Sequence, residues 1–317
     1  EPSFESPLSS LDAIADADLI IGADGVNSLV RNSHAAEFGA ALSHGSNKFI
    51  WYGVGKPYPT LTQTFRETER GAFTVHHYRY APDRSTFLVE VDAPTWHRAG
   101  FGSMDQAATM AYCEQVFEPE LDGHRLVANK SVWRNFPGVH NQRWWVGNKV
   151  LVGDALHTAH FSIGSGTKLA MEDAISLSKA LQGEREVAKA LPRYQQEREV
   201  EALRLQSAAR NRMEWFENVA RYAHLDAIQF SYTLLTGSQR LGHENLRLRD
   251  SRYVERVEKW MAYRAGLAVQ PVPPMFTPFR LRGMTVKNRV MVSPMAMYSA
   301  QAGVPAEFYL VHLGSRA

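Results

Sequence analysis

The stretch Lys149-Val-Leu-Val-Gly153-Asp154, followed by a loop to Gly164-Ser-Gly166, decides the fold of this chain. A short apolar run that ends in glycine is typical of a buried parallel strand, and the glycines beyond the loop open a predicted helix. A similar unit stands earlier, where Asp18-Leu-Ile-Ile-Gly22 precedes a turn and a helix start at Leu29-Val30-Arg31. Two such units predict a doubly wound α/β domain, whose ligands bind beyond the carboxyl ends of its strands.

The residues between these two units have a different character. Residues 48–54 and 71–80 are rich in aromatic and β-branched residues, residues 86–92 alternate less cleanly, and prolines separate the runs. This pattern predicts antiparallel strands. We therefore expect a β-rich substrate domain over residues 36–140, inserted into the α/β domain as a second layer.

Beyond Gly166 the pattern becomes helical. The helical spacing of Ala170, Ala174, Leu177 and Leu181 predicts the buried side of a first helix. A second, longer helix is predicted from near Pro192, a residue well tolerated in a first helical turn, towards His224.

A proline-rich segment at residues 266–274 predicts a semi-rigid linker. The apolar pattern restarts beyond it, which indicates a new domain over residues 275–317. The α/β domain is thus expected in two parts, residues 1–35 and 141–265. We also expect both ends of the chain to be cuts, because it begins without methionine and stops directly after an apolar segment.

Composition narrows the functional classes. The chain has 317 residues, of which 44% are hydrophobic and 21% charged, with a formal net charge of +2. These values are ordinary for a soluble globular protein and give no reason to expect nucleic acid as a partner. Cys113 is the single cysteine, which excludes an intrachain disulfide and fits a reducing cytoplasm. No apolar run reaches the roughly eighteen residues of a membrane helix, so no membrane association is expected.

The chemistry of the later motif suits a bound cofactor. Asp154, at the end of a strand, can accept hydrogen bonds from sugar or ribityl hydroxyls, and Gly164 and Gly166 let backbone N–H groups approach an anionic or electron-rich ring at a helix N-terminus. Taken alone this is a weak signal, because many helices begin with Gly-x-Gly and Leu169 stands where a third Rossmann glycine would be. Asp24-Gly25 is, by itself, typical of a turn.

The two motifs together, in this order around a β-rich insert, resemble the p-hydroxybenzoate hydroxylase family over residues about 15–225. Members of that family are single-component FAD aromatic hydroxylases. The resemblance implies that Asp154 contacts the ribityl and pyrophosphate region, and that Asp24 and Arg31 lie near FAD and support the use of NAD(P)H. Gly164, Ser165 and Gly166 would lie at the pyrimidine edge of the isoalloxazine. The implied FAD set is Asp24, Gly25, Arg31, Gly153, Asp154, Gly164, Ser165, Gly166 and Thr167.

The chain departs from that family in two respects. The opening Gly-x-Gly-x-x-Gly turn is missing, which we ascribe to the N-terminal cut, and Ala155–Ile163 lacks the prolines usual after Gly-Asp. His157 and His160 in this run either line the pocket and handle protons or pack on backbone. Trp51, Tyr78 and Tyr80 either line the substrate site or belong to the core, and no catalytic residue is assigned.

Residues 276–298 resemble the start of the old yellow enzyme family, a TIM barrel that binds FMN at the carboxyl ends of its strands. Lys287-Asn288-Arg289 would lead into the first barrel strand. By that likeness Tyr298 would face the substrate of this half. The implied FMN contacts are Ser293, Pro294, Met295 and Ala296.

The two halves in this order resemble fusions of the 2-aminobenzoyl-CoA monooxygenase/reductase and salicylyl-CoA 5-hydroxylase type. The resemblance implies NAD(P)H- and O2-dependent hydroxylation of an aromatic acyl-CoA, of the anthraniloyl or salicyloyl type, through a flavin C4a-hydroperoxide, with an FMN ene-reductase attached. A homodimer is compatible with it. Two alternatives stay open: a hydroxylase of free phenolic acids, and a non-catalytic fragment unable to hold flavin.

Overall fold

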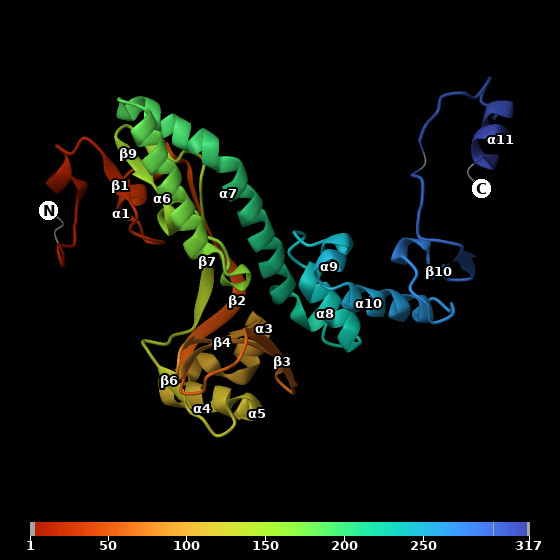
Figure 1. Ribbon diagram of the computed structural model, residues 1–317, viewed down its shortest axis with the longest axis horizontal. Coiled ribbons are helices and arrows are strands. Elements are labelled where there is room, and N and C mark those ends of the chain that lie inside the picture. The colour runs from red at the N-terminus through yellow and green to blue at the C-terminus, as the bar shows by residue number, and fades with distance from the viewer. Residues whose placement is uncertain (1–3, 294, 316–317) are drawn as a thin grey trace. The chain divides into compact units, whose positions relative to one another are not determined.

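The computed structural model describes residues 4–293 and 295–315, so Pro294, implied as an FMN contact, lies outside the described residues. The chain divides into two compact units, one ending at Leu246 and the other starting at Arg247. Figure 1 shows the elements along the chain. All residues implied for FAD belong to the first unit.

A small sheet forms the α/β part of the first unit. Its strand order is β1-β9-β8, with β1 (Ile20–Gly22) parallel to β9 (Lys149–Leu151) and β8 (Trp145–Val146) antiparallel to β9. The strands predicted at both motifs are therefore confirmed. They lie side by side although the whole β-rich insert separates them in sequence.

A six-stranded antiparallel sheet forms the insert, in the order β3-β4-β5-β2-β6, and β7 also pairs with β2. The three strands predicted from sequence are confirmed within β2, β4 and β5. The bounds are β2 (Ala40–Val54), β3 (Thr62–Thr68), β4 (Gly71–Ala81), β5 (Arg84–Val91), β6 (Leu126–Ala128) and β7 (Arg134–Asn141).

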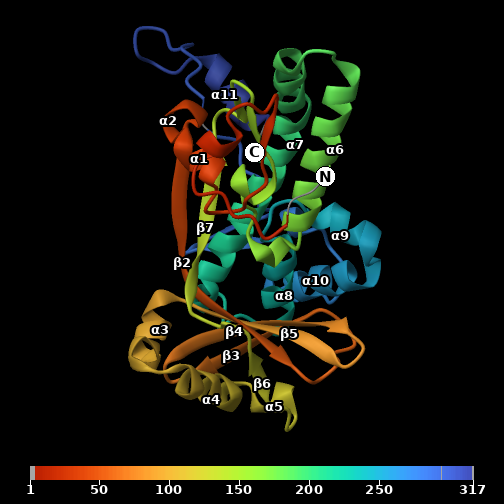
Figure 2. The ribbon, with the colours of Figure 1, turned by 90° about the vertical axis from the view of Figure 1, so that its left-hand side faces the viewer.

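The two faces of this sheet have different roles. Side chains alternate along β5, so that Phe87, Val89 and Val91 pack into one apolar cluster while Glu90 belongs to the other face. The cluster is covered by α3 (Ala93–Ala99), α4 (Gln106–Val116) and α5 (Glu118–Leu121), which lie below the sheet in Figure 2, with the short turn η2 (Phe101–Ser103) beside them. Part of the opposite face, at Ala72 and His76, packs against Trp215, Phe216 and Val219; the remainder, which we call the free face, is available for a site.

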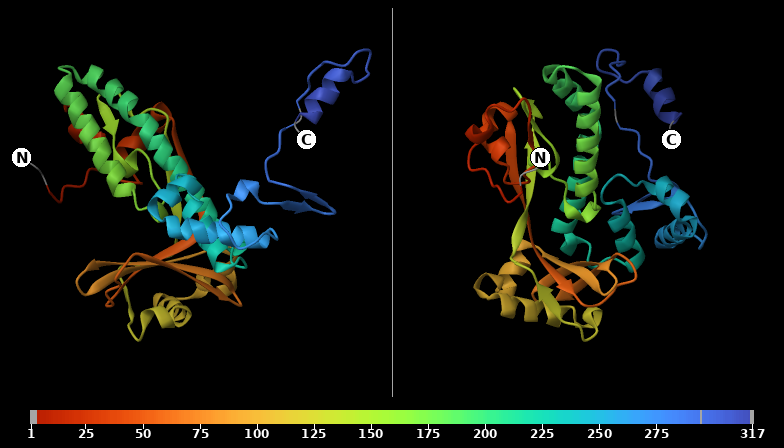
Figure 3. Two further views of the ribbon diagram at one scale, coloured as in Figure 1. Left: turned by 45° about the vertical axis from the view of Figure 1, so that its right-hand side comes forward. Right: turned by 60° about the vertical axis from the view of Figure 1, so that its left-hand side comes forward.

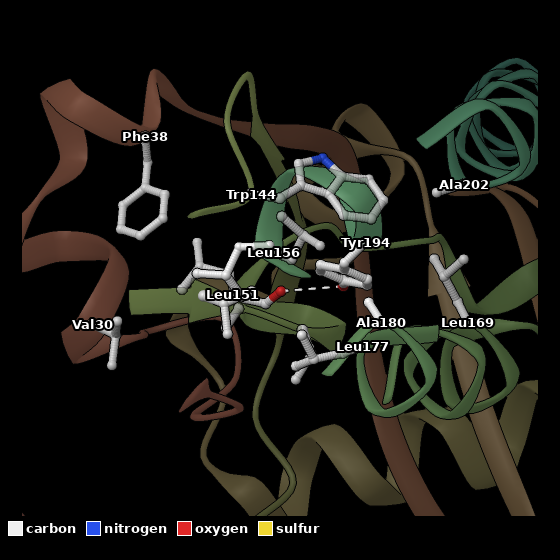
Figure 4. Packing of buried hydrophobic residues seen from close by; sticks show 14 of the residues in the cluster. Val30, Phe38, Trp144, Leu151, Leu156, Leu169, Leu177, Ala180, Tyr194 and Ala202 are labelled. Atoms are coloured by element: carbon white, nitrogen blue, oxygen red, sulfur yellow. Dashed lines mark hydrogen bonds between the residues drawn. The ribbon is translucent and has the colours of Figure 1, made fainter. Parts of the chain in front are cut away.

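Two long helices, α6 (Gly166–Gly183) and α7 (Val187–Glu217), pack against the α/β sheet. The core between them is drawn in Figure 4, where Leu151, Leu177 and Tyr194 meet and the Tyr194 hydroxyl donates to the Leu151 carbonyl at 3.3 Å. In both views of Figure 3, α7 runs alongside α6 and continues beyond it.

The buried row of α6 differs from the prediction. The structure buries Leu169, Asp173, Leu177 and Ala180, whereas Ala174 is exposed. A pattern of apolar residues alone could not include the charged Asp173 in the buried row, and the predicted row is therefore rotated relative to the observed one.

The predicted start of the second helix is also wrong. Pro192 lies inside α7, which begins at Val187, and the helix ends at Glu217 instead of continuing to His224. An interior proline lacks the N–H of one helical hydrogen bond and costs about 3 kcal/mol. The fully buried side chains of Leu191 and Tyr194 on either side hold the helix together across it.

Short elements complete the first unit. They are η1 (Leu11–Ile14), α1 (Leu29–Ser33), α2 (Ala35–Phe38), η3 (Gly153–Ala155), η4 (Phe161–Ile163), η5 (Val219–Arg221) and α8 (Ala227–Thr236), while α9 (His243–Arg249) contains the division between the units. No helix among the described residues combines the length and apolar character needed to cross a membrane.

The second unit does not form the predicted barrel strand. It contains α10 (Ser251–Arg264), η6 (Pro274–Phe276), a hairpin of β10 (Phe279–Leu281) and β11 (Met284–Val286), and α11 (Glu307–Gly314). Residues 290–293 have no strand structure. A parallel barrel strand needs hydrogen-bonding neighbours, and the described residues of this unit supply none there.

The residues implied for FMN are correspondingly exposed. Ser293, Met295 and Ala296 lie on the surface of a segment without regular structure, and Tyr298 is 93% exposed. These described residues form no cradle for an FMN, and the barrel stays a prediction.

Candidate functional site

The two sequence motifs meet at the carboxyl edge of the small sheet. The N–H of Val152 donates to the carbonyl of Gly22 at 3.0 Å, immediately before both loops begin. A side chain at position 22 would lie 2.7 Å from Leu151 Cδ2 and 2.9 Å from Val30 Cβ, so only glycine permits this close approach. Beyond the strands, the Arg31 guanidinium donates to the carbonyl of Ala155 at 3.0 Å and ties the two loops together.

The first motif is a turn whose side chains build its own helix. One carboxylate oxygen of Asp24 accepts the backbone N–H of Leu29 at 2.6 Å and of Val30 at 3.3 Å. Gly25 has φ of +76° and allows the chain to turn. Arg31 is buried, and burial lowers its pKa against the opposing charge of Asp24. Asp24 and Gly25 thus shape the loop that carries Arg31 to the junction.

The second motif presents Asp154 to solvent from a tightly held backbone. Gly153 has φ of +60°, and a Cβ there would lie 3.1 Å from Ala170 Cβ of α6. Asp154 is exposed within this turn. Desolvation by its surroundings raises the pKa of its carboxyl, and His157 opposes that rise. Its position at a strand's carboxyl end leaves the carboxylate available to a ligand hydroxyl.

A buried polar network beneath this turn was not predicted from the sequence. Asp173 is fully buried, and one of its oxygens accepts the N–H of Gly153 at 3.1 Å and His157 Nε2 at 2.6 Å. Its other oxygen accepts Arg198 Nε at 3.1 Å. His157 is therefore part of the support of the turn. The sequence signal for this network is the position of Asp173, which stands four residues from both Leu169 and Leu177 and therefore on the same, buried side of the helix.

The start of α6 forms an open cradle. Ser165 is the N-cap residue, but its hydroxyl donates to the carbonyl of Ile163 at 3.1 Å and makes no cap to the helix. Nothing lies within 4 Å of where a Cβ would stand at Gly164 or Gly166. The first-turn N–H groups, including that of Thr167, lack a side-chain acceptor there and suit an anionic or electron-rich ring edge. These residues fit the pyrimidine edge of a flavin.

Phe161 of η4 connects this cradle with the β-sheet. Its ring centroid lies 5.0 Å from that of Phe49, 6.3 Å from that of Trp51 and 5.6 Å from that of His76. These three side chains come from β2 and β4, on the face opposite the apolar cluster. The loop after Asp154 and the free face of the sheet therefore meet at the ring of Phe161.

A buried carboxylate lies beneath that contact. Glu90 accepts Asn47 Nδ2 at 2.8 Å and lies 3.3 Å from His76 Nε2. Burial would raise its pKa, but the hydrogen bond to His76, the influence of His160 and the hydrogen bond to Asn47 together lower it. Burial lowers the pKa of His160 to about 4, against the opposing charge of Glu90. His160, which contacts Ser162 Oγ at 2.7 Å, is thus neutral near pH 7.

The free face also contains a hollow of about 830 Å³. Trp51 and Tyr80, left open between substrate site and core, are 43% and 61% exposed and both line it, whereas the half-buried Tyr78 does not. The lining consists of Trp51, Tyr52, Gly53, Val54, Gly55, Tyr80, Arg84, Thr86, Val127, Ala128 and Asn129. Within the part of the chain that the structure describes, no group of His, Cys, Asp and Glu side chains is arranged to hold a metal.

Comparison with known proteins identifies the family of this chain. A family model described as "FAD binding domain" matches residues 11–209, more than half of the chain. The salicyloyl-CoA 5-hydroxylase of a Streptomyces species is 39% identical over 322 residues, covering 94% of this chain and 61% of that protein. The 3-hydroxy-4-methyl-anthranilyl-[aryl-carrier protein] 5-monooxygenase of Streptosporangium sibiricum is 39% identical over 204 residues, covering 64% of this chain and 54% of that protein.

A solved structure supports the fold assignment. Klebsiella pneumoniae HpxO complexed with FAD and uric acid aligns with a TM-score of 0.50 at 20% identity, over 74% of this chain and 59% of that chain. The chain spans about three fifths of the length of the curated relatives it matches. On the match over residues 11–209 and the identity with the two hydroxylating relatives, the chain belongs to the family of FAD-binding, flavin-dependent monooxygenases.

Proposed function

We propose that this protein hydroxylates an aromatic ring that is carried as a thioester, with FAD as cofactor and NAD(P)H as reductant. The balance is one aromatic C–H bond, O2, NAD(P)H and a proton on one side, and the hydroxylated ring, water and NAD(P)+ on the other. FAD, when bound, would supply the activation of O2 that delivers one oxygen atom to an electron-rich ring. The protein's own residues then bind, orient and exclude water.

The observation that carries the proposal is the meeting of the two loops at Arg31 and Ala155 beside an open helix N-terminus. Asp154 lies where a carboxylate can accept ribityl hydroxyls. The N–H groups of the residues after Gly164 and Gly166 would face the pyrimidine edge of the flavin, where the helix dipole stabilises negative charge. Gly153, Ser165 and Thr167 are also proposed to contact FAD, through their backbone atoms.

The sheet supplies the other wall of the reaction site. Phe161, Phe49 and Trp51 form an apolar cover that would keep water from an aromatic substrate at the junction. Glu90 and His76 beneath it form a hydrogen-bonded pair that can hold a proton close to this wall.

Two observations favour a thioester over a free phenolic acid. The two hydroxylating relatives are named for a CoA thioester and for an acyl group on a carrier protein. The hollow beside Trp51, at about 830 Å³, lies near the upper end of the range of roughly 300–1,000 Å³ that holds drug-sized ligands, and exceeds what one ring needs. The anthraniloyl and salicyloyl thioesters are the proposed substrates.

The attached FMN ene-reductase belongs to the same proposal. Its support is the sequence of residues 276–298 and the Streptomyces relative, whose alignment covers 94% of this chain and therefore extends into the second unit. A cytoplasmic location is proposed on the single cysteine, Cys113, and a homodimer is compatible with the proposal.

The test is flavin retention and substrate-dependent oxygen transfer. We expect the purified protein to bind FAD, to oxidise NAD(P)H faster when salicyloyl-CoA is added, and to incorporate one atom of labelled O2 into the product. Equal or greater stimulation by salicylate would favour the free-acid hydroxylase. Absence of flavin binding under any condition would favour the non-catalytic alternative and overturn the proposal.

A further inference from the structure

The hollow on the sheet begins next to the proposed reaction site. Trp51 forms one of its walls and is also the aromatic partner of Phe161. From Trp51 the lining continues across Gly53 and Thr86, which face each other on β2 and β5, to Tyr80 and Arg84 near the β4–β5 turn. A ligand with its ring at Phe161 could therefore extend along the sheet without leaving the surface.

The hollow has space above β2 because Gly53 has no side chain. A Cβ at Gly53 would lie 3.7 Å from the carbonyl oxygen of Val127 and 3.8 Å from Val127 Cβ, which are ordinary contact distances. A side chain is thus sterically allowed at this position, and it would project into the space of the hollow. The absence of one at Gly53 leaves that space to a ligand.

Arg84 supplies the positive charge. Of the described residues that line the hollow, Arg84 is the only charged one. Its Nε lies 3.6 Å from an oxygen of Asp83, and the two side chains are 67% and 76% exposed. Such an exposed pair is weak, so the remaining guanidinium donors are available to an anionic ligand.

The size of the hollow indicates an extended ligand. A cavity of about 150 Å³ is enough to hold a benzene ring. The hollow is more than five times larger, at about 830 Å³. It also combines two exposed aromatic rings with the polar side chains of Thr86 and Asn129.

We propose that the hollow binds the phosphopantetheine arm of the thioester substrate, with Arg84 at the phosphate. The arm contains two amides, which suit Thr86 and Asn129, and an apolar branched carbon, which suits Trp51 and Val127. The inference rests on the proposed function and assigns the part of the site that recognises the carrier of the acyl group. The same arm occurs in CoA and on acyl carrier proteins.

Two variants test different parts of the arm. Three probes are titrated into the FAD-loaded protein, and the dissociation constants are read from changes in the flavin absorbance: salicyloyl-CoA, salicyloyl-pantetheine and salicylate. Arg84→Met should weaken salicyloyl-CoA about tenfold through loss of a charge-assisted hydrogen bond, and should leave the other two probes unchanged. Gly53→Leu should weaken both thioesters and leave salicylate unchanged.

Arg79→Met is the matched control. Arg79 is exposed on the same hairpin but does not line the hollow, so the affinities for all three probes should match those of the wild type. Salicyloyl-phosphopantetheine then separates the two sources of the arm. If it binds as tightly as salicyloyl-CoA, the hollow ends at the phosphate, as a carrier-protein arm requires; if salicyloyl-CoA binds more tightly, the nucleotide is also recognised.

The outcomes separate this inference from the proposed function. If the wild-type protein binds and hydroxylates salicyloyl-CoA but Arg84→Met and Gly53→Leu bind it normally, the arm lies elsewhere and the inference is wrong. An equal loss of affinity for salicylate in either variant would also overturn it. If the wild type binds no thioester at all, the proposed function itself fails.

Discussion

The guanidinium of Arg31 donates a hydrogen bond to the carbonyl oxygen of Ala155 at 3.0 Å, and so joins two loops that lie on opposite sides of the β-rich insert in sequence. The same side chain also reaches the carbonyl of Val26 in its own loop. One buried residue thereby fixes the relative position of both motifs implied for FAD.

Replacing Arg31 with methionine should affect stability and cofactor binding together. The change leaves the carbonyl of Val26 without its donor and the carbonyl of Ala155 with only the longer bond from Asn141 Nδ2 at 3.4 Å, which should cost about 2 kcal/mol of the free energy of unfolding. The affinity for FAD should fall at least about tenfold because the two loops lose their tie. Urea denaturation and FAD titration measure both effects. Arg204→Met, an exposed position on α7, should change neither; a stable Arg31→Met variant with normal FAD affinity would contradict this role.

The buried charge of Asp173 should contribute more to the free energy of unfolding than any ion pair on the surface. Asp173→Asn removes the buried counter-ion of Arg198, which keeps only the partly exposed Glu172 at 2.6 Å, and should destabilise the protein by about 3 kcal/mol. The double variant Asp173→Asn/Arg198→Met removes both charges while an amide oxygen remains for the Gly153 N–H, and should be more stable than the sum of the two single changes predicts. Thermal unfolding of the wild type, the single variants Asp173→Asn and Arg198→Met, and the double variant compares them. If the double variant is as unstable as the sum of the single changes, the network does not act as a charge pair.

Gly166→Leu should separate binding from stability. No protein atom lies within 4 Å of the position that a Cβ would take, and leucine favours a helix more than glycine does, so the free energy of unfolding should be unchanged or higher by up to about 1 kcal/mol. The side chain would occupy the cradle implied for the flavin ring, and the affinity for FAD should fall. Gly283→Leu, at another position with open space, is the control. Normal FAD affinity in Gly166→Leu would place the flavin elsewhere.

Stability should decrease as the pH falls below 6.5. Burial lowers the pKa of His160 and of His77 to about 4, so the folded protein binds fewer protons than the unfolded chain between those values. The stabilisation is complete above pH 6.5 and is lost as the pH falls towards 4, by about 2 kcal/mol for each histidine between pH 7 and pH 5. Urea denaturation at both pH values checks this.

His160→Gln provides the comparison for that pH effect. The variant should lose about half of the change between pH 7 and pH 5, because His77 continues to titrate. The pKa of the Glu90 carboxyl is lowered, so the stabilisation that it provides is present at both pH values and is lost only at more acidic pH. An unchanged pH dependence in His160→Gln would show that this imidazole titrates as it does in the unfolded chain.

Much of the first unit could be predicted because its signals are local. Apolar runs that end in glycine gave β1 and β9, and aromatic, β-branched runs gave the sheet. Ligands of α/β domains bind beyond the carboxyl ends of the strands, so the loops that contain Asp24 and Asp154 were expected to lie close together. By contrast, Asp173 looks like a solvent-facing residue until Arg198, on another helix, is placed beside it. Pro192 looks like a helix start until Leu191 and Tyr194 are seen to hold both sides in the core.

The second unit shows the opposite limit. The string at residues 287–296 resembles a barrel strand in composition, but a strand of a closed barrel is stabilised by the strands on both sides of it. The hairpin of β10 and β11, by contrast, satisfies its hydrogen bonds without distant partners. The hairpin was not predicted from the sequence, and the predicted strand has no strand structure at residues 290–293.

The length of β2 has a mechanical consequence for the first unit. This strand starts at Ala40, next to Phe38 in the core of the α/β part, and ends at Val54 in the core of the large sheet. Its ladder with β7 shifts register between His44 and Lys48, where Asn135 Nδ2 contacts the carbonyl oxygens of the three residues in between, at 2.8–3.2 Å. A swing of the sheet towards or away from the cofactor loops would have to bend the chain at this bulge and first release the Asn135 amide. The stiffness of that joint, more than any surface loop, would then set how fast the two layers open.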